Sequence, residues 1–145
     1  MMKRLLGFLL LTACRPAPVA TLDTRTAVPL PAEAVQAVRV EMRTMLASLH
    51  DFQAGLATHD TARMHRAAVA SGLAAAADPA LEPLLPEGFL RLAVATHSQF
   101  DTLANAVAAG APMDSLLRRL PLVTANCVTC HATYRLETVP GELTH

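Results

Sequence analysis

Two cysteines and a histidine near the C-terminus, Cys127, Cys130 and His131, have the types and spacing of a cofactor-attachment site. Two thiols three residues apart can each form a thioether with a haem vinyl group, and the adjacent imidazole can then ligate the iron. The C-x-x-C-H pattern is the signature of c-type haem attachment. The sequence therefore predicts one covalent haem c, bound through Cys127 and Cys130, with His131 as an iron ligand.

Two other kinds of site also use a C-x-x-C pair, and both fit this chain less well. A thioredoxin-like redox pair belongs at the start of a helix that follows a strand, and the sequence indicates no βαβ unit. A zinc site needs four ligands, usually from a second Cys or His pair at close spacing, and no such pair follows the motif. Haem attachment is therefore the strongest interpretation of the motif.

The N-terminus has the features of an export signal. Residues 1–13 combine the basic Lys3 and Arg4 with an apolar run that is too short to span a bilayer as a helix. The three residues Leu-Thr-Ala before Cys14 are similar to a bacterial lipobox, in which the cysteine is diacylated and becomes the first mature residue. The alternative is an ordinary secretory signal beside an unmodified Cys14.

The cysteine count agrees with lipidation at Cys14. The chain has three cysteines, and an exported protein rarely leaves one thiol unpaired. One lipid anchor and two thioethers would use all three. Haem c is attached outside the bacterial cytoplasm, so the export signal and the C-x-x-C-H motif support each other. Arg15, in place of an Asp, favours the outer membrane by analogy with other lipoproteins, so we expect a lipid-anchored periplasmic protein.

Composition divides the rest of the chain into a tether and one domain. Residues 14–31 are rich in Pro, Thr and Ala and predict an extended tether. Residues 32–145 are enough for a single domain with one core. The formal net charge of the chain is zero and no basic patch is evident, so we expect no nucleic-acid partner.

The domain sequence predicts an all-α fold, because Ala, Leu, Arg and Glu dominate from Ala32 onwards and the apolar residues follow a helical period. The four predicted helices cover about residues 32–57, 60–77, 87–109 and 112–137. Asp60 is a plausible N-cap for the second helix, and Gly110 marks the end of the third. Pro121 lies within the last helix and predicts a kink, or a helix that begins only after it.

Apolar seams on these helices indicate which faces pack together. On the last helix, positions i, i+3 and i+4 share a face, so Cys127, Cys130 and His131 should point towards the other helices. The seam of the first helix recurs at steps of three and four. Its members are Val35, Val38, Met42, Met45, Leu49, Phe52 and Leu56.

The C-terminal position of the motif, and its continuation into Tyr134 and Arg135, resembles the cytochrome c′ family of haem proteins, which carry C-x-x-C-H-x-x-Y-R. The resemblance covers the four predicted helices, and only the motif is specific. It implies an antiparallel four-helix bundle with the haem attached to the C-terminal helix. Family members often dimerise through their first two helices, so a homodimer is a further expectation that the sequence leaves open.

The resemblance also implies which residue lies on the distal side of the iron. In the family, a bulky apolar residue early in the first helix leaves the iron five-coordinate, and a methionine there makes it six-coordinate. Alignment of the first helix brings Met42 to this position, with Met45 one turn later. His97, on the inner face of the third helix, is another alternative, although it also fits a core histidine with a hydrogen-bond partner. A methionine on an apolar seam can equally be core filler.

Two residues after the motif are expected to contact the haem. Tyr134 should pack against the haem edge. Arg135 could pair with a haem propionate or with a carbonyl near the helix end, or it could remain a solvated cation.

These expectations favour a monohaem electron carrier with redox proteins as partners, and not an enzyme. Ligation by His131 and Met42 raises the reduction potential and leaves no open iron position for substrate. The alternative is a five-coordinate protein that binds NO or CO, in which Met42 only crowds the distal side. A peroxidase-like enzyme is disfavoured because no distal His–Arg pair can be identified.

Overall fold

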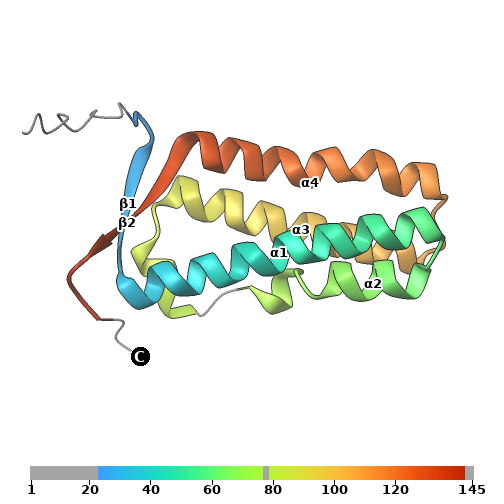
Figure 1. The fold of residues 1–145 in the computed structure, drawn as a ribbon, viewed down its shortest axis with the longest axis horizontal. Helices are drawn as coiled ribbons and strands as arrows, with labels where there is room; N and C mark the ends of the chain where they lie inside the picture. The colour runs from blue at the N-terminus through green and yellow to red at the C-terminus, as the bar shows by residue number, and fades with distance from the viewer. Residues whose placement is uncertain (1–22, 77–78, 143–145) are drawn as a thin grey trace, which may run out of the picture.

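The computed structural model describes residues 23–76 and 79–142, which form a mostly helical protein (Figure 1). The predicted signal, the lipidation residue Cys14 and most of the predicted tether lie outside the described residues. The helices are α1 (Ala32–Thr58), α2 (Thr61–Val69), α3 (Glu87–Ala108) and α4 (Met113–Thr133). Two 3-10 helices, Leu73–Ala75 and Pro79–Leu84, lie between α2 and α3.

Helices α1 and α2 are joined by a tight turn. His59 adopts the left-handed conformation, with φ of 57°, and closes α1. The next residue, Asp60, caps α2 as predicted, because its carboxylate accepts a hydrogen bond of 2.8 Å from the backbone N–H of Arg63. Gly55 allows the two helices to approach closely, since a Cβ there would lie 2.8 Å from the Met64 Cγ. Helix α2 is shorter than the predicted 60–77, because the chain leaves the helix after Val69.

Helix α3 begins and ends close to its predicted bounds, and α4 begins close to its predicted start. Gly110, with φ of 70°, follows the end of α3 in the conformation that glycine adopts without strain. Helix α4 continues through Pro121, so the alternative of a helix that begins after this proline is wrong. Proline has no backbone N–H, so one helix carbonyl loses its hydrogen-bond donor. Pro121 is exposed, and water can donate to this carbonyl instead.

The fold departs from the all-α expectation in a small parallel sheet at one end of the helices (Figure 1). Strand β1 (Thr26–Pro31) pairs with β2 (Tyr134–Val139), and Thr26 lies opposite Tyr134. The end of the predicted tether is therefore an ordered strand, and α4 ends at Thr133, before the predicted 137. Parallel strands cannot be joined by a short hairpin turn, and four helices lie between these two strands in the chain. No local sequence pattern therefore predicts their pairing.

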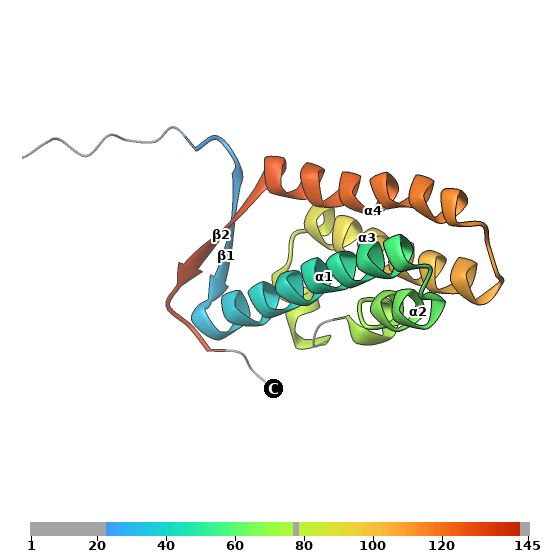
Figure 2. The same cartoon turned by 45° about the vertical axis from the view of Figure 1, so that its right-hand side comes forward.

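Buried side chains form two separate cores. The first lies among all four helices, where α2 packs against α1 and α3, and α4 packs mainly against α3 (Figures 1 and 2). Its members include Leu49, Phe52, Met64, Phe100, Leu103, Leu116, Leu120 and Val123. The second core lies beneath the sheet. It contains Val28, Leu30, Ala34, Val35, Val38, Leu81 and Phe89.

Within the residues that the structure describes, no helix combines the length and apolar character needed to cross a membrane.

Candidate cofactor site

Two adjoining hollows lie where the last turns of α4 face α1 and α3. One holds about 70 Å³ and is lined almost entirely by apolar atoms. The other holds about 250 Å³ and opens beside the sheet. Four residues line both hollows: Met42, Phe89, Cys130 and His131. The two hollows therefore adjoin at these four residues, and we refer to them together as the candidate site.

The C-x-x-C-H residues lie along one side of this site. Cys127, Cys130 and His131 all line the smaller hollow, as their helical spacing predicts. The two thiols are half-buried, whereas His131 is exposed and lies at the mouth. Burial raises the pKa of the Cys127 thiol. Burial also raises the pKa of the Cys130 thiol, and the neighbouring charge of a Cys127 thiolate raises it further.

Neither cysteine of the motif is in a disulfide. The Cys127 thiol donates a weak hydrogen bond to the Val123 carbonyl oxygen at 3.8 Å, which leaves its sulfur on the face of α4 that borders the hollow. Both cysteines therefore lie on the side of α4 that borders the smaller hollow.

The two methionines proposed from the sequence lie across the hollow from the motif. Met42 and Met45 come from α1, and both line the smaller hollow with Cys127 and His131. Both are half-buried, although the seam residues on either side of them, Val38 and Leu49, are buried. A thioether sulfur is a ligand for haem iron, and either methionine is placed on the wall opposite the motif.

His97 does not line either hollow; it is a core histidine with hydrogen-bond partners. Its side chain is only 3 % exposed. Its Nδ1 lies 2.9 Å from the Ser71 carbonyl oxygen, and its Nε2 lies 2.8 Å from a Glu41 carboxylate oxygen. Both partners are acceptors, so an imidazolium that donates from both nitrogens satisfies them best. The Glu41 hydrogen bond and the Ser71 carbonyl raise the pKa of His97 despite its burial, which disfavours the charged form.

Tyr134 lines the larger hollow at the point where α4 passes into β2. Its ring packs edge-on against Phe89 of α3, with the ring centroids 5.5 Å apart. Gly88 makes this contact close, because a Cβ there would collide with the Tyr134 hydroxyl. Tyr134 and Phe89 together form an aromatic wall beside Cys130.

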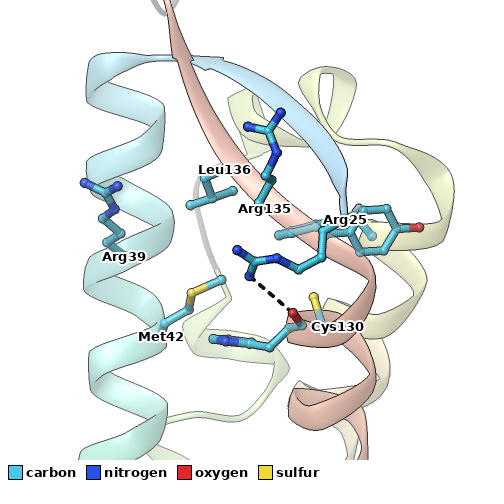
Figure 3. A pocket seen from close by; sticks show the side chains of 9 residues that line it. Arg25, Arg39, Met42, Cys130, Arg135 and Leu136 are labelled. Carbon is cyan, nitrogen blue, oxygen red and sulfur yellow. Dashed lines mark hydrogen bonds between the residues drawn. The ribbon is translucent and has the colours of Figure 1, made fainter. Parts of the chain in front are cut away.

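Three arginines surround the larger hollow, which has no carboxylate among its lining residues (Figure 3). Arg39 comes from α1 and Arg135 from β2, and Arg135 also forms an ion pair of 2.8 Å with Glu137. Arg25 precedes β1, and its guanidinium extends into the space between α1 and α4 towards Met42 (Figure 3). Three arginine side chains therefore border the hollow, and two of them, Arg25 and Arg135, are in ion pairs with the nearby carboxylates of Asp23 and Glu137, whereas the walls are largely apolar.

Arg25, Arg39 and Phe89 were not predicted as site residues. Arg25 belongs to the stretch predicted as a tether. Only the pairing of β1 with β2, in which Ala27 lies opposite Arg135, brings Arg25 to the hollow. Arg39 could have been found, because it precedes Met42 by one helical turn. Phe89 lies one turn before Ala93 on α3 and could have been included in the seam.

The described residues fit a c-type haem in donor chemistry and in wall character. Two thiols, an imidazole and two thioethers line the smaller hollow, together with Glu41 and apolar side chains. Arginine side chains border the adjoining larger hollow. No cluster of three or more His, Cys, Asp or Glu side chains within residues 23–76 and 79–142 could hold a metal ion by itself.

Comparison with known proteins adds no relative: no family model, no curated protein and no solved structure matches the chain.

Proposed function

We propose that this protein is a monohaem c-type cytochrome that carries electrons in the bacterial periplasm. The observation that carries the proposal is the single apolar hollow that Cys127, Cys130 and His131 share with Met42 and Met45. The proposal includes an antiparallel four-helix bundle of the cytochrome c′ type. Its support is the position of the motif on the last helix and the packing of α3 between α2 and α4.

Each residue of the site has a separate role in this proposal. Cys127 and Cys130 form the two thioethers, which hold the cofactor against α4. His131 supplies the proximal imidazole, and Met42 supplies the distal thioether, with Met45 as the alternative one turn later. The haem, when bound, exchanges one electron between ferric and ferrous iron, and Met/His ligation raises its potential. No residue is required to act as a catalytic base, so we propose no enzymatic activity.

The surroundings of the site support a role in electron exchange with other proteins. His131 is exposed and the larger hollow opens to the surface, so one edge of the site is accessible to a redox partner. The predicted lipid anchor at Cys14 would hold this domain at a membrane surface, for which we propose the outer membrane. A homodimer remains part of the proposal, from the family resemblance.

Absorption spectra of the haem-matured protein test the function directly. We expect a sharp α-band in the reduced state that does not change when CO is added, because two protein ligands occupy the axial positions. A broad high-spin spectrum that sharpens with CO would contradict the carrier function. It would instead support the alternative, a five-coordinate haem protein for NO or CO, in which Met42 only crowds the distal side.

The variants Met42→Ala and Met45→Ala identify the distal ligand. If Met42 is the ligand, Met42→Ala converts the iron to high spin and creates CO binding, whereas Met45→Ala keeps the low-spin spectrum. The reverse pattern would assign the ligand to Met45. The two variants are well matched, because both methionines are half-buried on the same helix and line the same hollow.

A further inference from the structure

Arg25 is the residue that links the N-terminal strand to the candidate site. Its Nη1 donates a hydrogen bond of 3.3 Å to the His131 carbonyl oxygen, across 106 residues of chain (Figure 3). It thereby contacts the last turn of α4 beside the proposed iron ligand. The stretch that resembles cytochromes c′ begins with α1, so Arg25 lies outside it.

The guanidinium of Arg25 already binds one carboxylate. Its Nε and Nη2 donate to the two oxygens of Asp23, at 2.9 and 2.7 Å. This is the two-bond geometry in which arginine recognises planar anions. The same contact holds the pKa of Asp23 at about 2. Asp23 therefore occupies the Nε and Nη2 edge of the guanidinium, and an incoming carboxylate would bind the remaining Nη donors or displace Asp23.

Arg25 retains donors that these contacts do not use. A guanidinium has five N–H groups, of which two donate to the Asp23 carboxylate and one donates to the His131 carbonyl oxygen. The other two have no hydrogen-bond partner among residues 23–76 and 79–142. Arg39 and Arg135 line the same hollow, so a carboxylate there would meet guanidinium groups from α1, from the residue before β1 and from β2.

We propose that Arg25 binds a carboxylate of a tetrapyrrole, a haem propionate, and holds the cofactor edge against β1 while it anchors the last turn of α4. This inference rests on the proposed haem function and adds the residue that orients the cofactor in the hollow. Arg39 and Arg135 supply neighbouring positive charge. The pairing of β1 with β2 thus positions Arg25, the residue before β1, beside the hollow, although Arg25 belongs to none of the helices.

Porphyrin binding without covalent attachment tests this role of Arg25. The full chain carrying Cys127→Ala and Cys130→Ala is titrated with haemin and, separately, with haemin dimethyl ester, whose carboxylates are blocked. Both titrations are repeated with Arg25→Gln added. Arg118→Gln is the matched control, because Arg118 forms an equivalent ion pair of 2.7 Å with Asp114 on α4 but lines neither hollow.

We expect the parent to bind haemin about tenfold more tightly than the diester, the size of one charge-assisted hydrogen bond. Arg25→Gln should remove this preference and leave the diester affinity unchanged, which also shows that the variant is folded. Arg118→Gln should retain the preference. In a second variant, Asp23→Asn, the guanidinium loses its internal carboxylate, and the preference for haemin should rise.

Equal affinity of the parent for haemin and its diester would overturn the proposal, and so would a preference that survives in Arg25→Gln. Either result leaves the proposed function standing if the wild-type chain takes up covalent haem. Failure of the wild-type chain to take up haem at Cys127 and Cys130, under conditions that mature other c-type cytochromes, is the separate result that would remove the proposed function.

Discussion

The two cores and the space between them differ in how completely the helices bury their apolar seams. In the first core, Phe52 of α1, Phe100 of α3 and Leu116 of α4 are at most 1 % exposed. Nearer the sheet, the same three seams become half-buried at one level of the molecule. The half-buried residues are Met42 and Met45 on α1, Leu92 and Ala93 on α3, and Cys127 and Cys130 on α4.

This difference identifies the level of the molecule at which the side chains of α1, α3 and α4 do not fill the space between the helices. Helix α3 packs closely on α4, but α1 and α4 approach each other little where the motif lies, and the two hollows remain between them. Apolar walls that face an unfilled space lose dispersion contacts and hydrophobic burial. A flat apolar group inserted at this level would join the first core to the second.

The largest expected effect is in the first core, which needs no cofactor. Phe52→Ala should lower the free energy of unfolding by about 3–5 kcal/mol, because Phe52 is fully buried among all four helices. Urea denaturation of the variant with and without attached haem measures the effect, which should be similar in both. Leu46→Ala, on the same helix but 68 % exposed, is the control. A loss below about 1 kcal/mol for Phe52→Ala would mean that the first core does not dominate stability.

The second-largest expected effect is on hydrogen exchange at the end of α4 that borders the candidate site. If the protein carries the proposed haem, its loss in the Cys127→Ala/Cys130→Ala variant should accelerate amide hydrogen exchange in the last two turns of α4 by about 100-fold. This factor is equivalent to about 2.7 kcal/mol of lost ligand stabilisation. Amides around Phe52 should change much less. Val128→Ala, which keeps the motif intact at a position 69 % exposed, is the control. A uniform change along the molecule would contradict the separation of the two regions.

Pro121 lies on α4 between the first core and the motif. Pro121→Ala should raise the free energy of unfolding by about 1–3 kcal/mol, because it restores a helical hydrogen bond at an exposed position in the helix interior. Thermal or urea unfolding measures the gain, with the exposed Leu122→Ala as control. A destabilised variant would indicate that the proline is needed for the course of α4 towards the site.

The smallest expected effect is the pH dependence that His97 contributes. The pKa of His97 in the folded protein is raised above 6.5. Its contribution to the free energy of unfolding is therefore fully present below about pH 6.5 and is lost as the pH rises through the folded pKa. Stability should therefore fall with rising pH in this window, by at most about 1.4 kcal/mol per pH unit for one proton. His97→Gln should abolish this slope, whereas His50→Gln, at an exposed position of α1, should keep it. An unchanged slope in His97→Gln would assign the proton to another group.

Helix positions could be predicted from the sequence because their signals are local. The bounds of α1 and α3 follow from an apolar period and from Gly110, and the Asp60 cap follows from the preference of a carboxylate for free N–H groups. The end of α2 could not be predicted, because an alanine-rich stretch such as 74–77 has helical propensity without contacts that would stabilise a longer helix.

The sequence by itself determined which residues could act together chemically: a C-x-x-C-H motif whose residues share one helix face, and methionines at helical spacing on another apolar seam. These features depend on residue type and on a period of 3.6, so they can be identified without coordinates. Only the tertiary structure decided that the motif, Met42, Met45 and Phe89 line one hollow, and that Arg25 lines the larger hollow beside it. Those contacts join segments far apart in the chain, through a parallel strand pair and helix packing that no local pattern specifies.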